Sequence, residues 1–144
     1  MVSQRRRIDN NSIIVAEAAT LEQFCPDLAN WPELWKVEHS DIAIGQRIVA
    51  LIQPFLLDLL QHGLAHNTLA RHRDHMQMLG GEIIRRRHDD PDLAKQPIQD
   101  LLFNLIEDDG GPLIWPRITE SAQNSFDTTC RKLYRFLKQP KLPK

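Results

Sequence analysis

The sequence predicts an all-α protein, a compact bundle of four to five helices. Apolar residues recur three or four positions apart in each long segment, which is the period of an amphipathic helix. No segment alternates apolar and polar residues as a half-buried strand does. Gly and Pro clusters separate the helical segments, and 144 residues with 42% hydrophobic content are enough for one domain with a real core.

We expect three parts along the chain. Residues 1–40 form an N-terminal arm and docking segment, and residues 41–138 form the helical domain. Residues 139–144 form an extended tail or linker rich in Pro and Lys.

The docking segment carries large apolar side chains close to the helical domain. We expect Trp31, Leu34 and Trp35 to pack on that domain. The alternative is an exposed apolar surface through which these tryptophans bind a partner protein.

The first predicted helix, over residues 41–62, is strongly apolar. Pro54 interrupts it, so either the helix bends there or a second helix begins at the proline, where a first-turn proline costs little. The predicted buried stripe is broad and consists of Ile48, Leu51, Ile52, Phe55, Leu56, Leu59 and Leu60.

The next predicted helix follows Gly63 and opens with the polar pair Asn67 and Thr68. Spacings of three and four place Leu69, His72, Met76, Leu79 and Ile83 on its buried face. Its open face carries Arg71 and His75. Gly80 and Gly81 cost about 2 kcal/mol in a helix interior, so an end at Leu79 with a separate turn over residues 82–87 is an alternative.

Two further helices are predicted after an acidic connection at residues 88–96. The first covers residues 97–107, and Trp115 is expected to fill a gap between helices. The last runs from Ile118 to about Lys138, with a buried stripe of Ile118, Ala122, Phe126, Cys130, Leu133 and Leu137. Another face of this helix is basic and polar, and it carries Asn124, Thr128, Arg131, Arg135 and Lys138, with Lys132 beside it.

The sequence gives little support for catalysis or for a metal. The pairs His62/His66 and His72/His75 have ligand-like spacing, but no cysteine or H-E-x-x-H motif joins them. No G-x-S-x-G motif or phosphate-binding glycine loop is present. We therefore expect no catalytic residue, no metal and no cofactor, and we expect the protein not to be an enzyme.

The N-terminal sequence and the cysteine content indicate a cellular location. Arg5, Arg6 and Arg7 are not followed by the apolar run of a signal peptide. No stretch approaches the ~18 apolar residues of a membrane span. With two cysteines, Cys25 and Cys130, we expect a soluble cytoplasmic protein with reduced thiols and no membrane partner.

Charge is unevenly distributed despite a formal net charge of -1. Residues 63–88 and 113–144 are basic, whereas residues 89–112 between them are acidic. Arg and Lys neutralise phosphates, and Asn, Thr and His reach phosphate oxygens or base edges. The candidate DNA-binding residues on these helices are Asn67, Thr68, Arg71, His75, Arg131, Lys132, Arg135 and Lys138, and the alternative is that they form an ordinary solvated helix surface.

The stretch FLLDLLQHGLAHNTLARHRDHMQML resembles the start of the SAM-like core-binding domain of tyrosine recombinases, the phage-integrase family. The matching positions are Phe55, Leu56, Leu59, Gly63, Leu64 and Thr68, with Met76 and Leu79 at the later apolar positions. The segment TTCRKLYRFLK is similar to the closing helix of that domain, and QPKLPK to the linker that leads to the catalytic domain. The resemblance covers about residues 46–144.

The chain also departs from the family pattern. Ala65 stands where a capping serine is usual, so Asn67 or Thr68 is expected to cap the helix instead. His72 stands where an aromatic residue is usual. No histidine begins an H-x-x-R pair, and the single tyrosine, Tyr134, is expected to pack rather than act as a nucleophile.

The resemblance implies a DNA-binding module of a site-specific recombination system, which clamps duplex DNA without catalysis of its own. Its partners would be duplex DNA and a recombinase catalytic domain or another protein. The alternative is a protein-interaction or regulatory module of a mobile element that keeps the helical fold but does not bind DNA.

Overall fold

The computed structural model describes residues 20–106 and 110–139, and within them the protein is all-α, as predicted. Among these residues, four helices have eight residues or more: α4 (Asp41–Leu60), α5 (His66–Asp89), α7 (Ile98–Leu105) and α8 (Glu120–Lys138). The short elements there are α2 (Leu21–Phe24), the 3₁₀ turn η2 (Leu28–Asn30), α3 (Trp31–Trp35) and α6 (Pro91–Ala94). Residues 1–19 of the predicted arm and docking segment and residues 140–144 of the predicted tail lie outside the described residues.

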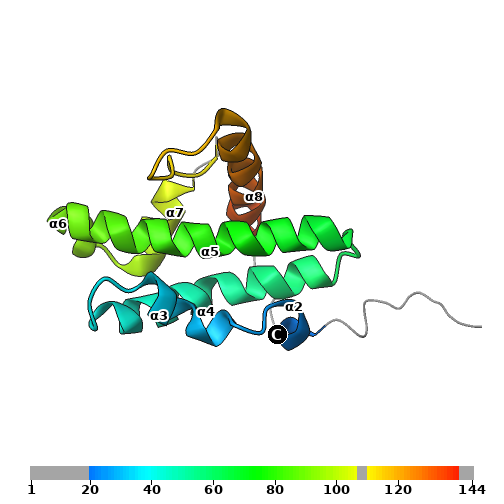
Figure 1. Ribbon diagram of the computed structural model, residues 1–144, viewed down its shortest axis with the longest axis horizontal. Coiled ribbons are helices and arrows are strands. Elements are labelled where there is room, and N and C mark those ends of the chain that lie inside the picture. The colour runs from blue at the N-terminus through cyan, green and yellow to red at the C-terminus, as the bar shows by residue number, and fades with distance from the viewer. Residues whose placement is uncertain (1–19, 107–109, 140–144) are drawn as a thin grey trace, which may run out of the picture.

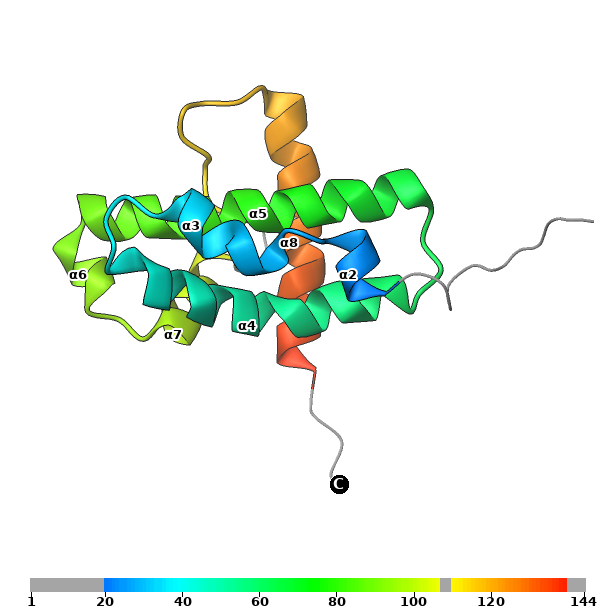
Figure 2. The ribbon, with the colours of Figure 1, turned by 60° about the horizontal axis from the view of Figure 1, so that its bottom comes forward.

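Helices α4 and α5 form a long antiparallel pair, and the other elements cover its two sides (Figure 1). The views in Figures 1 and 2 place α2 and α3 on one side of this pair and α8 on the other, where α8 crosses both helices. The core lies between these layers and includes Ile52, Phe55, Met76, Ile83 and Phe126. Helix α5 is therefore covered from two directions.

Both long helices continue through the residues that could end them. Helix α4 is one helix with Pro54 inside it, so no second helix begins at the proline. Helix α5 continues through Gly80 and Gly81 to Asp89, so an end at Leu79 is wrong. The reason is packing: the indole of Trp35 lies against Gly80, where a Cβ atom would come within 2.2 Å of the ring.

The docking segment packs on the helical domain mainly through its tryptophans. Trp31 is 1% exposed and Trp35 is 8% exposed, and Trp35 Nε1 donates to the backbone oxygen of Gln77 at 2.8 Å. Leu34, which we expected to pack with them, is 57% exposed. The two tryptophans are therefore core residues and leave no exposed tryptophan surface on this side.

Two apolar residues near α8 are more exposed than the sequence predicts. Trp115, expected to fill a gap between helices, is 65% exposed because the segment before α8 runs over the surface. Ala122, expected in the buried stripe, is also exposed, because α8 reaches beyond the helices it covers in its first turn.

Within the described residues, α4 alone is long and apolar enough to cross a membrane by length and composition. The expectation that no stretch approaches a membrane span did not include α4, because charged residues such as Arg47 and Asp58 lie among its apolar ones. One face of α4, which includes Ile48, Ile52 and Phe55, is fully or almost fully buried within the protein core.

Candidate nucleic-acid interface

The first turn of α5 begins one residue before the predicted polar pair. His66 is its first residue and Ala65 its N-cap, with no side-chain capping bond. The expectation that Asn67 or Thr68 caps the helix is therefore wrong. Asn67 is exposed and Thr68 is half-buried in the first turn, where backbone N–H groups have no intrahelical acceptor. Such a helix start favours anions.

The second half of α8 supplies most of the positive charge among the predicted DNA-binding residues. Residues 128–138 contain four Arg or Lys and no Asp or Glu. Arg135 and Lys138 are exposed, whereas Arg131 and Lys132 are half-buried. The ammonium of Lys138 lies 5.1 Å from the ring centroid of Tyr134.

Tyr134 has the packing role that we expected for it. Its ring stacks on Phe103 of α7, with 4.9 Å between the ring centroids. This stacking fixes one side of α8 against α7.

His75, predicted to contact DNA, lies inside the contact between α5 and α8. It is 8% exposed, and its Nδ1 lies 2.7 Å from Thr129 Oγ1. Its ring also meets the edge of Phe126, with 5.7 Å between the centroids. The prediction was wrong because it assumed that α5 buries one face only. Helix α8 covers a second face of α5, and His75 lies on it.

Thr129 joins both buried histidines and was missed in the sequence. His72 Nδ1 also lies 2.7 Å from Thr129 Oγ1, and Lys132 Nζ lies 2.9 Å from His72 Nε2. Thr129 is three residues after Phe126 and four before Leu133, so the period of the buried stripe could have found it.

The bonding capacities of these groups set the direction of the hydrogen-bond chain. The ammonium of Lys132 only donates, so His72 Nε2 accepts and His72 Nδ1 carries the proton. His72 Nδ1–H then donates to the Thr129 hydroxyl, which donates in turn to His75 Nδ1. This arrangement requires both imidazoles to be neutral.

The same surroundings hold both histidines in the neutral form. Burial is the largest cause that lowers the pKa of His72, and together with the neighbouring Lys132, His75 and Arg71 it brings this pKa to about 4. Burial also lowers the pKa of His75, as does the charge of Arg71. Arg71 on α5 and Lys132 on α8 therefore act on the same imidazole.

The folded protein should lose stability as the pH falls toward 4. The pKa of His72 is lower in the folded chain, about 4, than its ordinary value of 6.5, so the unfolded chain binds a proton first. Its contribution is fully present above pH 6.5 and falls progressively between 6.5 and 4. Urea unfolding at pH 7.5, 6.0 and 4.5 measures how the free energy of unfolding depends on pH. His72→Gln should flatten the profile, whereas the control His39→Gln, at an exposed site, should not. A wild-type profile that is flat over this range would contradict the prediction.

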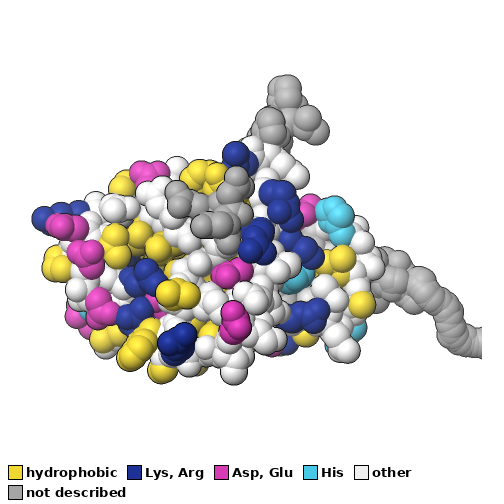
Figure 3. Space-filling model, turned by 90° about the horizontal axis from the view of Figure 1, so that it is seen from above, with side chains coloured by type: hydrophobic (Ala, Val, Ile, Leu, Met, Phe, Trp, Pro, Cys, Tyr) yellow, Lys and Arg dark blue, Asp and Glu magenta, His cyan; other side chains and the backbone are white. Residues whose placement is uncertain are grey.

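The structure brings three of the predicted site residues together, because Arg71 and Lys132 both act on His72, and Lys132 and Arg135 line one hollow. Figure 3 shows Lys and Arg side chains in groups on the side of the molecule that it views. We use the name α5–α8 basic face for the predicted residues on the first turns of α5 and the second half of α8, which are Asn67, Thr68, Arg71, Arg131, Lys132, Arg135 and Lys138. His75 does not belong to it.

Among residues 20–106 and 110–139, no three His, Cys, Asp or Glu side chains lie together as metal ligands would. Cys25 and Cys130 are both free and buried, and burial raises the pKa of the Cys25 thiol to about 12. A thiol in that state is a poor nucleophile at neutral pH.

No protein-family model, curated protein or solved structure matches this chain. The resemblance to the core-binding domain of tyrosine recombinases stays a prediction.

Proposed function

We propose that this chain is a non-enzymatic DNA-binding module that holds duplex DNA against the α5–α8 basic face. The observation that carries the proposal is the convergence of two helices at His72. Lys132 of α8 bonds to His72 Nε2 at 2.9 Å, and the charge of Arg71 on α5 acts on the same ring. Cations from separate helices thereby form one surface.

The size of this surface suits a DNA backbone. The basic second half of α8, residues 128–138, is about 16 Å long, which exceeds the ~12 Å width of the major groove of DNA. Exposed Arg135 and Lys138 on α8 can then meet phosphates at a different point from Arg71 at the start of α5. Contacts of this kind supply affinity and position rather than sequence recognition.

Several acidic side chains are paired elsewhere in the protein, which limits their opposition to DNA despite the net charge of -1, whereas Asp58 lines a hollow together with Lys132 and Arg135. Helix α5 has 24 residues, so Asp89 at its end lies about 35 Å from its start. Glu82 and Asp89 are used in ion pairs with Arg85, and Asp41 accepts from His88 at 2.8 Å. These carboxylates are occupied within the protein and do not oppose phosphates at the start of α5.

Reversing two exposed charges of the basic face should weaken DNA binding at least tenfold. Arg71 and Arg135 come from different helices, and neither makes a hydrogen bond or ion pair with another described residue. Each lost phosphate contact should reduce the slope of log K against log[salt] by about 0.9, so Arg71→Glu with Arg135→Glu should reduce it by about 2. Fluorescence anisotropy with a labelled duplex at several salt concentrations measures both effects.

The matched control makes the same change of net charge elsewhere. Lys36 and Lys95 each make a surface ion pair, and Lys36 follows α3 on the side opposite α8. Lys36→Glu with Lys95→Glu should bind DNA within about threefold of wild type, because distant surface charges are screened at physiological salt. Equal losses in both double variants would show general charge attraction and contradict the assigned face.

We propose a role in site-specific recombination, and this part of the proposal rests on the resemblance alone. The proposal includes a recombinase catalytic domain as partner and a cytoplasmic location. The alternative function, a protein-interaction module that does not bind DNA, loses one of its arguments because Trp31 and Trp35 are buried. That alternative would follow from a folded protein that binds no duplex at low salt.

A further inference from the structure

The segment over residues 110–119 runs between α7 and α8, and side chains of α8 hold its backbone. We call it the strap. The Gly111 N–H donates to Asp127 Oδ1 at 3.1 Å. The amide of Gln123 accepts from the Ile114 N–H at 3.1 Å and donates to the Pro112 oxygen at 3.0 Å.

Helix α5 holds the same strap from the other side. Arg86 Nη2 donates to the backbone oxygen of Leu113 at 3.0 Å, and the Trp115 N–H donates to Glu82 Oε1 at 3.3 Å. Glu82 is 4% exposed and is paired with Arg85 and Arg86. The strap backbone is therefore fixed from two helices.

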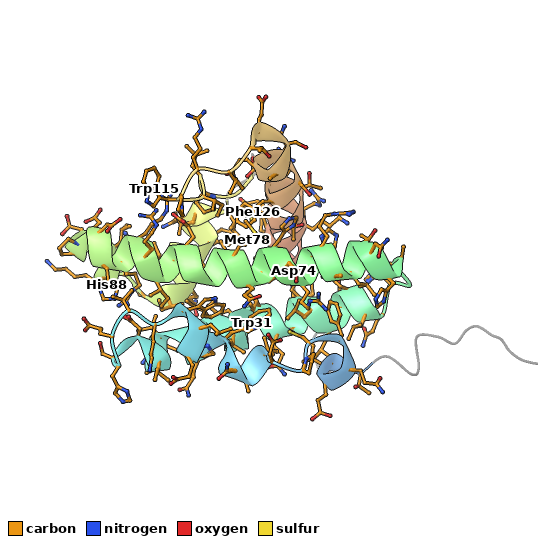
Figure 4. All side chains as sticks on the ribbon, in the orientation of Figure 1. Trp31, Asp74, Met78, His88, Trp115 and Phe126 are labelled. Carbon is orange, nitrogen blue, oxygen red and sulfur yellow. The ribbon has the colours of Figure 1, made fainter. Side chains whose placement is uncertain are left out.

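The strap nevertheless presents its largest side chains to solvent. Leu113 is 75% exposed and Trp115 is 65% exposed, and Figure 4 shows Trp115 projecting from the strap beside α5. A rigid backbone that displays an aromatic side chain loses little conformational entropy when a partner covers it. Trp is also among the residues most enriched in protein-interaction hot spots.

A cleft of about 760 Å³ lies beside these side chains. Its charged wall consists of Arg85, Arg86, Arg117 and Glu120. Arg85 and Arg86 are already paired with Glu82. Arg117 has no ion-pair or hydrogen-bond partner among the described residues, so it is the cation available to a ligand.

We propose that this cleft docks a segment of another protein that carries one carboxylate beside a large apolar side chain. The apolar side chain would cover Trp115 and Leu113, and the carboxylate would pair with Arg117. A nucleic acid fits less well, because its backbone needs several cations, whereas Arg85 and Arg86 are paired with Glu82 and Asp89 and only Arg117 of the charged wall has no partner among the described residues. The proposal uses a different surface from the α5–α8 basic face and does not depend on DNA binding.

The test selects a display library of random twelve-residue peptides on the immobilised full chain, with counter-selection on the Trp115→Ser/Arg117→Glu variant. We expect the selected peptides to contain Asp or Glu close to a large apolar residue. A labelled peptide from the selection should bind at least tenfold more weakly to Trp115→Ser and to Arg117→Glu. Replacing its carboxylate with the amide should weaken binding to a similar degree. The DNA-face variant Arg71→Glu/Arg135→Glu should bind it as wild type does.

Both single variants should keep the wild-type circular dichroism and melting temperature, because Trp115 and Arg117 are exposed. A selection that yields no peptide dependent on Trp115 and Arg117 would overturn the proposal. If the wild-type chain self-associates and Trp115→Ser does not, the occupant of the cleft is a second copy of this chain and the proposal is overturned. If the wild-type chain binds an oligonucleotide and Trp115→Ser does not, the occupant is a nucleic acid and the proposal is likewise overturned.

Discussion

Replacing Thr129 with valine is expected to lower the free energy of unfolding by about 2–4 kcal/mol, because two buried imidazoles lose their shared hydroxyl. Thr129 is fully buried, and its oxygen lies 2.7 Å from Nδ1 of both His72 and His75. Valine has nearly the same shape, so the loss comes from unsatisfied polar groups rather than from a cavity. Urea unfolding at pH 7.5 measures the difference.

The neighbouring threonine provides the control. Thr128 is exposed, and its hydroxyl donates to the backbone oxygen of Asn124 one turn earlier in the same helix. Thr128→Val should change the free energy of unfolding by less than about 0.5 kcal/mol. Equal effects of the two substitutions would show that the hydroxyl of Thr129 does not hold α5 and α8 together.

Replacing Gly80 with alanine is expected to destabilise the protein by about 2–3 kcal/mol through overpacking. The added Cβ atom would come within 2.2 Å of Cζ2 in the Trp35 indole, so the ring or the helix must move. Trp35 is itself held by the hydrogen bond from Nε1 to Gln77 of the same helix, which limits how far the ring can move. Thermal and urea unfolding of the variant measure the cost.

Gly81 gives a matched substitution on the same helix. Its added Cβ atom would lie 3.4 Å from Trp35 Cδ1, an ordinary contact distance. Gly81→Ala should therefore leave stability unchanged or raise it by up to about 1 kcal/mol, the helix preference of alanine over glycine. A Gly80→Ala variant as stable as Gly81→Ala would contradict the close packing of Trp35 on α5.

The fold class was predictable because the long helices repeat apolar residues at helical spacing. The continuity of α5 was not, since the local cost of Gly80 and Gly81 is outweighed by contacts with Trp35, which is distant in the sequence. This error concerns a point where tertiary packing overrides local preference.

The candidate site was predictable where it depends on one helix and not where it depends on two. The basic residues of α8 repeat on one side of a single helix, and Arg135 and Lys138 are exposed as expected. The burial of His75 depends on α8 crossing α5, which no spacing within α5 encodes. The exposure of Trp115 likewise depends on the path of the strap over the surface.

DNA binding through the basic face is tested most directly by titrating the full chain into a labelled duplex at two or more salt concentrations. Arg71, Arg131, Lys132, Arg135 and Lys138 offer up to five phosphate contacts. If most of them form, log K should fall with log[salt] with a slope of about -3 to -4. No binding at low salt, or binding that salt does not weaken, would contradict the proposed function.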